Sequence, residues 1–166
     1  MQNLTMYVLA ASTLGTVRDH ANARNLTPPA FTREFGATLK LRLFAQPEDE
    51  APYPIAQLQD IDSWQCVWDK DYAATTPPII VADSDDIQLH SVTDTINGVE
   101  RTFTELVIPV SQMNTDRIAQ FLGDAEYKDG LVMEIVGYNA DSEAVFGLQI
   151  KNFTIRNRVF LGTLSA

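Results

Sequence analysis

The chain has 166 residues, with 12 Lys and Arg against 22 Asp and Glu, and its formal net charge is −10. This acidic balance repels phosphate backbones and anionic lipids, so we expect neither nucleic-acid binding nor membrane insertion. A hydrophobic share of 45% can supply a buried core, and no uncharged apolar run approaches the ~20 residues of a transmembrane helix.

Residues 1–35 are predicted to form a strand and then an arm or linker, ahead of a main domain over residues 36–166. The run Leu4–Leu14 is apolar, and no Lys or Arg precedes it, so we interpret it as a strand and not as a secretion signal. The polar connector Val17–Gly36 contains Pro28-Pro29, a pair that cannot lie in a central strand. Two alternatives stay open for residues 1–17: they cross to another subunit, or they fold back as a first or edge strand of their own domain.

Alternation of apolar and polar residues recurs along the main domain and predicts β-strands. In the first such run the leucines share one face, while Lys40 and Arg42 share the other. Asn97-Gly98 is a strong hairpin-turn signal, because both residues tolerate the positive φ that tight turns demand. The predicted strands are Ala37–Ala45, Ile61–Lys70, Pro78–Val81, Ile87–Val92 and Arg101–Val110.

The C-terminal part of the chain predicts a β-hairpin. Two alternating runs, Leu131–Val136 and Ala144–Ile150, flank the polar turn Asn139–Glu143. A third run, Phe153–Val159, continues the second, but its alternation is out of step with it. This slip in parity predicts a β-bulge near Asn152.

One short helix is predicted over Thr115–Leu122. Thr115 can cap its free amides, and Gly123 suits the left-handed position that follows a helix. Its apolar residues recur at helical spacing: Ile118, Phe121 and Leu122. With short strands elsewhere and frequent Pro, Asn and Asp in the turns, the pattern predicts a mainly β fold. We expect an antiparallel β-sandwich, jelly-roll-like, with this one α-helix, which would close one end of the sheet pair.

No set of side chains has the spacing of a catalytic, cofactor-binding or metal-binding site, and we predict none. Cys66 is the single cysteine, which excludes an intramolecular disulfide. It alternates with Trp64 and Trp68 on one strand face, so we interpret it as a small buried hydrophobe rather than a nucleophile. His20 and His90 are interpreted as solvated surface residues, because nothing in the sequence pairs either with a nucleophile.

One carboxylate cluster and one single glutamate are candidate sites. The first lies in one loop and comprises Asp83, Asp85 and Asp86. These residues could offer oxygen ligands to calcium, but the loop lacks the spacing of an EF-hand, so we interpret it as an ordinary acidic turn. The second is Glu134, which lies in an apolar strand and could serve a glycosidase. We predict instead that it points outward or pairs across the sheet with Arg156 or Arg158.

The aromatic residues around the Ile61–Lys70 strand could form a sugar-stacking platform, because flat apolar rings suit sugar faces. Trp64 and Trp68 share their strand face with Cys66, which favours a place in the core. Tyr72 follows in the next loop and is expected to be exposed. Trp68 and Tyr72 are the candidate carbohydrate contacts.

From about Gly36 to Val159 the chain resembles a β-rich domain of phage or prophage tail proteins, the fibre and baseplate components. The segments that carry the resemblance are Gly36–Leu41, Ser63–Asp71, Ala74–Pro78, Met113–Thr115 with the short helix that follows, Glu134–Tyr138 and Asn152–Val159. The span from Gly36 to Val159 makes up about three quarters of the chain. No collagen-like or coiled-coil repeat of a full fibre accompanies them.

The resemblance implies a non-catalytic structural module that mediates tail assembly or attachment. It implies a homo-oligomer, a trimer in a fibre, that contacts other tail proteins and needs no cofactor. The protein would then occur in the virion, or in the bacterial cytoplasm when expressed from a prophage. The alternative function is a carbohydrate-binding β-sandwich module that recognises a cell-surface glycan.

Overall fold

The computed structural model contains two β-sheets and, among the residues it describes, one α-helix. Those residues are 2–10, 16–19, 24–25, 28, 30–33, 37–46, 51–52, 54–70, 72, 77–83, 85–96, 98–110 and 115–158. Sheet A contains β1 (Gln2–Leu9), β2 (Thr16–Asp19), β3 (Arg24–Asn25), β5 (Ala37–Gln46), β6 (Ala51–Pro52), β9 (Gln88–Ile96) and β10 (Val99–Val110). Sheet B contains β4 (Ala30–Thr32), β7 (Ser63–Asp69), β8 (Ile80–Asp83), β11 (Tyr127–Tyr138) and β12 (Ala144–Arg156). The helix is α1 (Thr115–Leu122), and a short 3₁₀ turn, η1, covers Ile55–Gln57.

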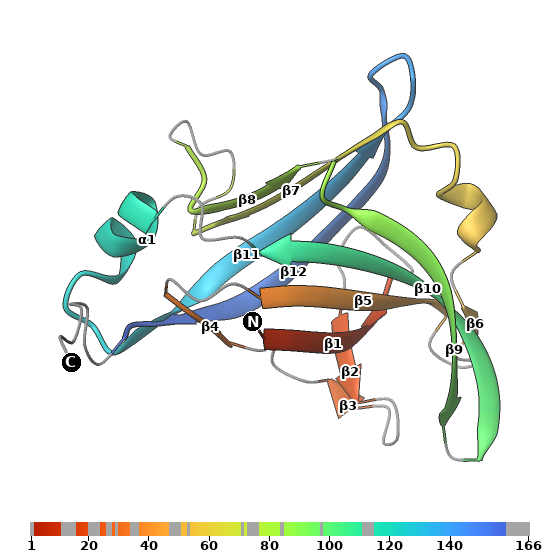
Figure 1. Cartoon of the computed structure of the whole chain (residues 1–166), viewed down its shortest axis with the longest axis horizontal. Coiled ribbons are helices and arrows are strands. Elements are labelled where there is room, and N and C mark those ends of the chain that lie inside the picture. The colour runs from red at the N-terminus through yellow and green to blue at the C-terminus, as the bar shows by residue number, and fades with distance from the viewer. Residues whose placement is uncertain are drawn as a thin grey trace, which may run out of the picture.

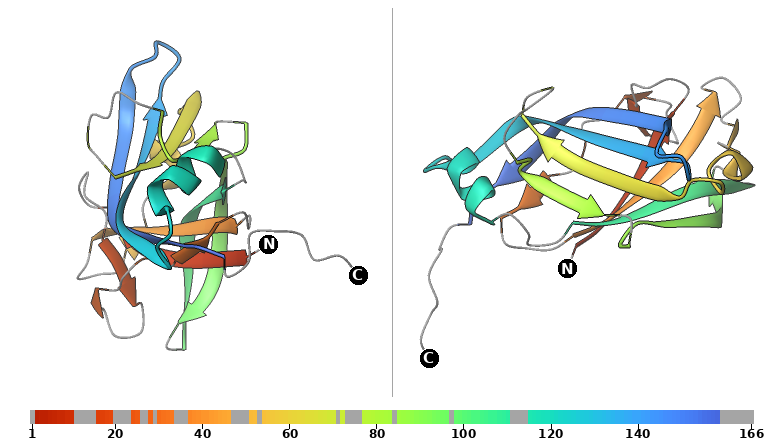
Figure 2. Two further views of the ribbon diagram at one scale, coloured as in Figure 1. Left: turned by 90° about the vertical axis from the view of Figure 1, so that its left-hand side faces the viewer. Right: turned by 90° about the horizontal axis from the view of Figure 1, so that it is seen from above.

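The two sheets pack face to face around a single apolar core, so the predicted mainly β fold with one short helix is confirmed (Figures 1 and 2). The strand order is β3-β2-β1-β5-β10-β9 in sheet A, with β6 also on β5, and β4-β12-β11-β7-β8 in sheet B. The side chains on one face of each sheet point into this core. The largest fully buried contributors include Leu39, Leu41, Leu106 and Ile108 from sheet A and Trp68 and Phe153 from sheet B.

The alternating patterns place their residues as predicted. In β5 the three leucines are fully buried, while Lys40 and Arg42 lie on the outer face. The predicted bulge in β12 is confirmed as well. Leu131 lies opposite Phe153 and Met133 opposite Ile150, so β12 carries one residue more than β11 between these pairs. Asn152 takes up the extra length with a φ of 69°.

The N-terminal run folds back onto its own domain, which was one of the two predicted alternatives. β1 lies between β2 and β5, with Met6 and Val8 buried. β4 joins the opposite sheet beside β12, where Phe31 is buried. Residues 1–35 therefore supply strands to both sheets.

Two strand pairs differ from the expected antiparallel arrangement. β1 runs parallel to β5, and β4 runs parallel to β12. A parallel neighbour needs a long crossover connection, and the chain between β1 and β5 provides one because it visits the other sheet at β4.

The helix α1 has the predicted bounds and lies at one end of the sandwich (Figures 1 and 2). Ile118 and Leu122 are buried, and Phe121 is partly buried against the core. Gly123 has a φ of 55°, and its amide donates to the carbonyl of Ala119, as predicted for the residue after a helix. The expected Thr115 side-chain cap lies outside the described side chains.

The β9–β10 hairpin projects beyond the rest of sheet A. β10 pairs with β5 only from Thr104 to Val110, whereas it pairs with β9 from Val99 to Val107. The segment around the turn is therefore a two-stranded ribbon, and Figure 1 shows it (green) curving past the ends of β5 and β1. Gly98 in the turn has a φ of 77°, and its predicted partner Asn97 lies outside the described residues.

Candidate functional site

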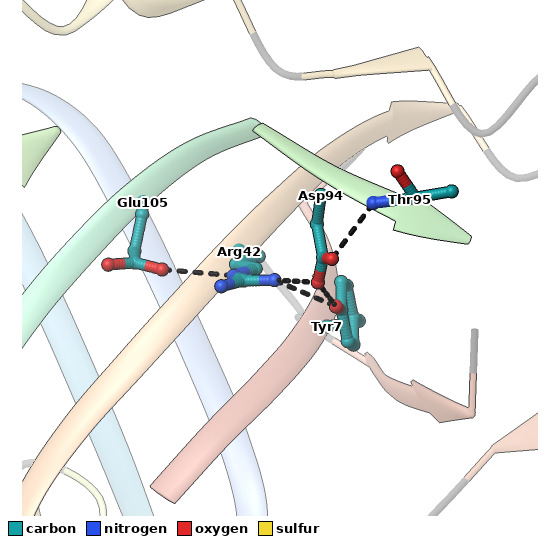
Figure 3. Close-up of polar contacts among 5 residues, drawn as sticks. All are labelled: Tyr7, Arg42, Asp94, Thr95 and Glu105. Atoms are coloured by element: carbon teal, nitrogen blue, oxygen red, sulfur yellow. Dashed lines mark hydrogen bonds and ion pairs between the residues drawn. The ribbon is translucent and has the colours of Figure 1, made fainter. Parts of the chain in front are cut away.

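A polar cluster lies at the base of this ribbon, on the outer face of sheet A. Four adjacent strands contribute one side chain each: Tyr7 from β1, Arg42 from β5, Glu105 from β10 and Asp94 from β9 (Figure 3). Strand register brings them together, because Tyr7 lies opposite Arg42 and Arg42 opposite Glu105.

Arg42 is the centre of the cluster. Its Nε donates to Glu105 Oε2 at 3.0 Å, and its Nη1 donates to Asp94 Oδ2 at 2.7 Å and to the Tyr7 hydroxyl at 2.9 Å. The Tyr7 hydroxyl also lies 3.3 Å from Asp94 Oδ2, to which it donates. Asp94 Oδ1 accepts the amide of Thr95 at 2.8 Å. One guanidinium thus links the body of the sheet to the ribbon.

The cluster becomes more exposed from the sheet toward the ribbon. The exposed fraction of the side chain is 5% for Glu105, 17% for Arg42 and 45% for Asp94. The Glu105 carboxylate is therefore withdrawn from water and depends on Arg42 for charge compensation. Asp94 keeps one side toward solvent.

An aromatic contact accompanies the ionic one. The rings of Tyr7 and Phe103 meet edge to face with centroids 5.5 Å apart, and the Arg42 guanidinium lies 5.5 Å from the centroid of the Tyr7 ring. Phe103 is 1% exposed although it belongs to the outward-facing set of β10. Apolar and ionic contacts together hold the ribbon against β1 and β5.

Three groups of this cluster, Tyr7, Arg42 and Asp94, each keep one protonation state near neutral pH. Burial raises the pKa of Tyr7, against the opposing effect of Arg42. The hydrogen bond from Arg42 lowers the pKa of Asp94, and the amide of Thr95 adds to this effect. Burial would lower the pKa of Arg42, but its bonds to Glu105 and Asp94 outweigh that and raise it. Tyr7 stays neutral while Arg42 and Asp94 stay charged, so these three groups do not act as acid or base near pH 7.

The structure places Cys66 and His90 in different sheets. Cys66 is fully buried, as predicted, and burial together with the charge of Glu134 raises the pKa of its thiol. His90 is exposed on β9, as predicted, with Nε2 3.0 Å from Gln88 Oε1. His20 lies outside the described residues.

The two carboxylate candidates belong to different parts of sheet B, because β7 lies between β11 and β8. Glu134 lies on the outer face of β11, which is the first of the two predicted alternatives. The second alternative, a pairing with Arg156 or Arg158, is wrong. It accepts a hydrogen bond from Gln149 at 2.7 Å, because the β11–β12 register sets these two residues opposite each other. Asp85 and Asp86 are exposed in a turn, and the Asp83 side chain lies outside the described part. Within that part, no three His, Cys, Asp or Glu side chains are grouped to hold a metal ion.

The two candidate carbohydrate contacts have opposite surroundings. Trp68 is fully buried, and its ring meets the rings of Phe31 and Phe153 edge to face at centroid distances of 5.9 and 6.2 Å, so it cannot stack on a ligand at the surface. The prediction of Trp68 as a carbohydrate contact is therefore wrong, whereas its predicted place in the core is confirmed. Tyr72 is 55% exposed, and the Lys151 ammonium lies 5.9 Å from its ring centroid.

Sequence reasoning did not find the Arg42 cluster. The only available signals were a charged residue in each of two predicted strands, Arg42 and Glu105, and a tyrosine in the N-terminal run. Which strands are neighbours could not be inferred from these patterns.

Comparisons with protein-family models, curated proteins and solved structures found no match for this chain. In the described part of the structure no helix is long and apolar enough to cross a membrane.

Proposed function

We propose that the protein is a non-catalytic structural component of a phage or prophage tail, a fibre or baseplate module that acts in assembly or attachment. The observation that supports this best is the projecting β9–β10 ribbon, which the Arg42 cluster links to β1 and β5. An arm that ionic and aromatic contacts hold against the sandwich suits repeated contacts between neighbouring subunits, because a preorganised arm loses little conformational entropy when it docks.

The chemistry of the cluster supports contact rather than catalysis. Its guanidinium is committed to two carboxylates and a phenol, and none of the three groups with a shifted pKa is tuned toward neutrality. The proposed partners are other copies of the chain, with a trimer as the expected number in a fibre, and other tail proteins. The proposed location is the virion, or the bacterial cytoplasm when the gene is expressed from a prophage.

Particle composition tests this proposal. Prophages of the bacterium that carries the gene are induced, tail-containing particles are purified by density gradient, and their proteins are quantified by mass spectrometry. We expect the chain in the particles at a fixed ratio to the other tail proteins. Particles that assemble without it would refute the proposal.

The second candidate is a carbohydrate-binding module, which the exposed ring of Tyr72 beside Lys151 favours. A glycan array tests it with the wild-type protein and Tyr72→Ala. Specific binding that Tyr72→Ala abolishes at an unchanged melting temperature would support this function, and an array without binding would contradict it.

A further inference from the structure

We propose that β9 is a self-association surface, through which two copies of this chain pair β9 with β9 in an antiparallel ladder across a two-fold axis. The inference rests on the free edge of β9 and on its His90 and Asp94 side chains, and it does not depend on the tail assignment.

β9 is an edge strand with one unused side. It pairs with β10 along its whole length, and in the described part of the structure no other strand pairs with it. Natural edge strands are usually protected by proline, lysine or a bulge. β9 has the sequence QLHSVTDTI, without proline or lysine, and its register with β10 is continuous. Such an edge is a template for strand addition.

The register shows which backbone groups of β9 face outward. Pro109 in β10 has no N–H and lies opposite Thr38 of β5, so we assign these two residues as a non-hydrogen-bonded pair. Such pairs alternate with hydrogen-bonded pairs along an antiparallel ladder, so the backbone groups of the odd-numbered residues of β10 point away from β5. They face β9, where the even-numbered residues are their partners, such as Asp94 opposite Arg101. The N–H and C=O groups of Ser91 and Thr93 therefore point to the free edge.

The side chains of His90 and Asp94 favour one register for a second copy. With Val92 on the two-fold axis, each His90 lies opposite Asp94 of the other copy, and each Ser91 lies opposite Thr93. The Ser91–Thr93 pairs exchange both backbone hydrogen bonds, whereas His90–Asp94 is a non-hydrogen-bonded pair, in which side chains lie closest. A shift of the axis to Ser91 or Thr93 would set a polar side chain, His90 or Asp94, opposite the apolar Val92. A further shift would set Asp94 opposite Asp94 or His90 opposite His90.

The Arg42 cluster prepares Asp94 for this contact. Arg42 and Tyr7 bind one carboxylate oxygen and the Thr95 amide binds the other, so the side chain has a fixed position while 45% of it stays exposed. The Thr95 amide is used by this contact, which limits the ladder to the middle of β9.

A cysteine at the axis tests the register directly. Val92→Cys places two thiols opposite each other in a non-hydrogen-bonded pair, whose Cβ atoms are about 4.5–5.5 Å apart and can move into a disulfide. Mild oxidation of the native full chain should give a covalent dimer on non-reducing gels. Gln88→Cys is the matched control on the same strand and face, and we expect at least tenfold less dimer from it. Equal cross-linking of the two variants, or none from Val92→Cys, would overturn the proposal.

Sedimentation velocity tests the same contact without a cross-link. Ser91→Pro removes an outward N–H and no bond to β10, Ser91→Ala keeps that N–H, and His90→Glu opposes Asp94. We expect the wild-type protein and Ser91→Ala to dimerise equally, with at least tenfold weaker association for the other two. A monomer or a trimer at all concentrations, or a dimer that His90→Glu leaves unchanged, would overturn it. Should Ser91→Pro fail to fold, His90→Glu decides.

Discussion

Removal of the Arg42 side chain should destabilise the protein strongly through the charge it leaves behind. In Arg42→Met the Glu105 carboxylate, only 5% exposed, loses its guanidinium partner at 3.0 Å. Breaking a buried ion pair on one side costs about 3–5 kcal/mol. Because Arg42 itself is 17% exposed and water can reach part of the site, we expect the lower end, about 3 kcal/mol of unfolding free energy.

Urea unfolding followed by tryptophan fluorescence measures this loss. Lys40→Met is the matched control, since Lys40 lies on the same strand and face, and surface changes of this kind cost about 0.5 kcal/mol or less. The double variant Arg42→Met with Glu105→Leu should recover part of the loss, because no buried charge remains. If Arg42→Met costs no more than Lys40→Met, or if the double variant is no more stable than Arg42→Met, the buried-charge reasoning is wrong.

Four further predictions concern single residues. Gly137→Ala should cost about 1–3 kcal/mol in urea unfolding, because an added Cβ would lie 2.6 Å from Ile61 Cδ1, and an unchanged midpoint would contradict the packing. Asn152→Ala should cost about 1 kcal/mol in the same assay, because φ is 69° there, while Asn152→Gly should cost less. Iodoacetamide should label Cys66 at least a hundredfold more slowly in the native than in the urea-unfolded protein, because burial raises the pKa of the thiol, and equal rates would refute this. Asp94 has a lowered pKa in the fold, so its stabilisation is present above its unfolded pKa of about 3.9 and disappears as the pH falls through the folded value. In Asp94→Asn the free energy of unfolding should fall less steeply as the pH is lowered through the acidic range than in the wild-type protein. An equally steep fall in both proteins would argue against the network.

The sequence alone determined the features that depend on local geometry. Period-two alternation predicted which face of β5 is buried, because successive side chains of a strand point to opposite sides. The parity slip predicted the bulge at Asn152, and the residue types predicted the helix Thr115–Leu122 with Gly123 after it. Each of these follows from neighbours within a few residues along the chain.

Only the tertiary structure decided what lies beside each strand. Trp64 and Trp68 lie on the same face of β7, yet Trp68 is fully buried and Trp64 is half-buried. The difference follows from their neighbours, since Trp68 packs against Phe31 of β4 whereas Trp64 packs against Phe146. Glu134 pairs with Gln149 because of the β11–β12 register.

The Arg42 cluster and the place of β1 likewise depend on strand order. Arg42 and Asp94 are 52 residues apart in sequence, and β1 joins β5 only after the chain has crossed to the other sheet. Alternation says which way a side chain points, but many strand orders bury the same apolar faces. The order that forms is selected by the packing of the whole core, and the charges on the outer face meet only as its consequence.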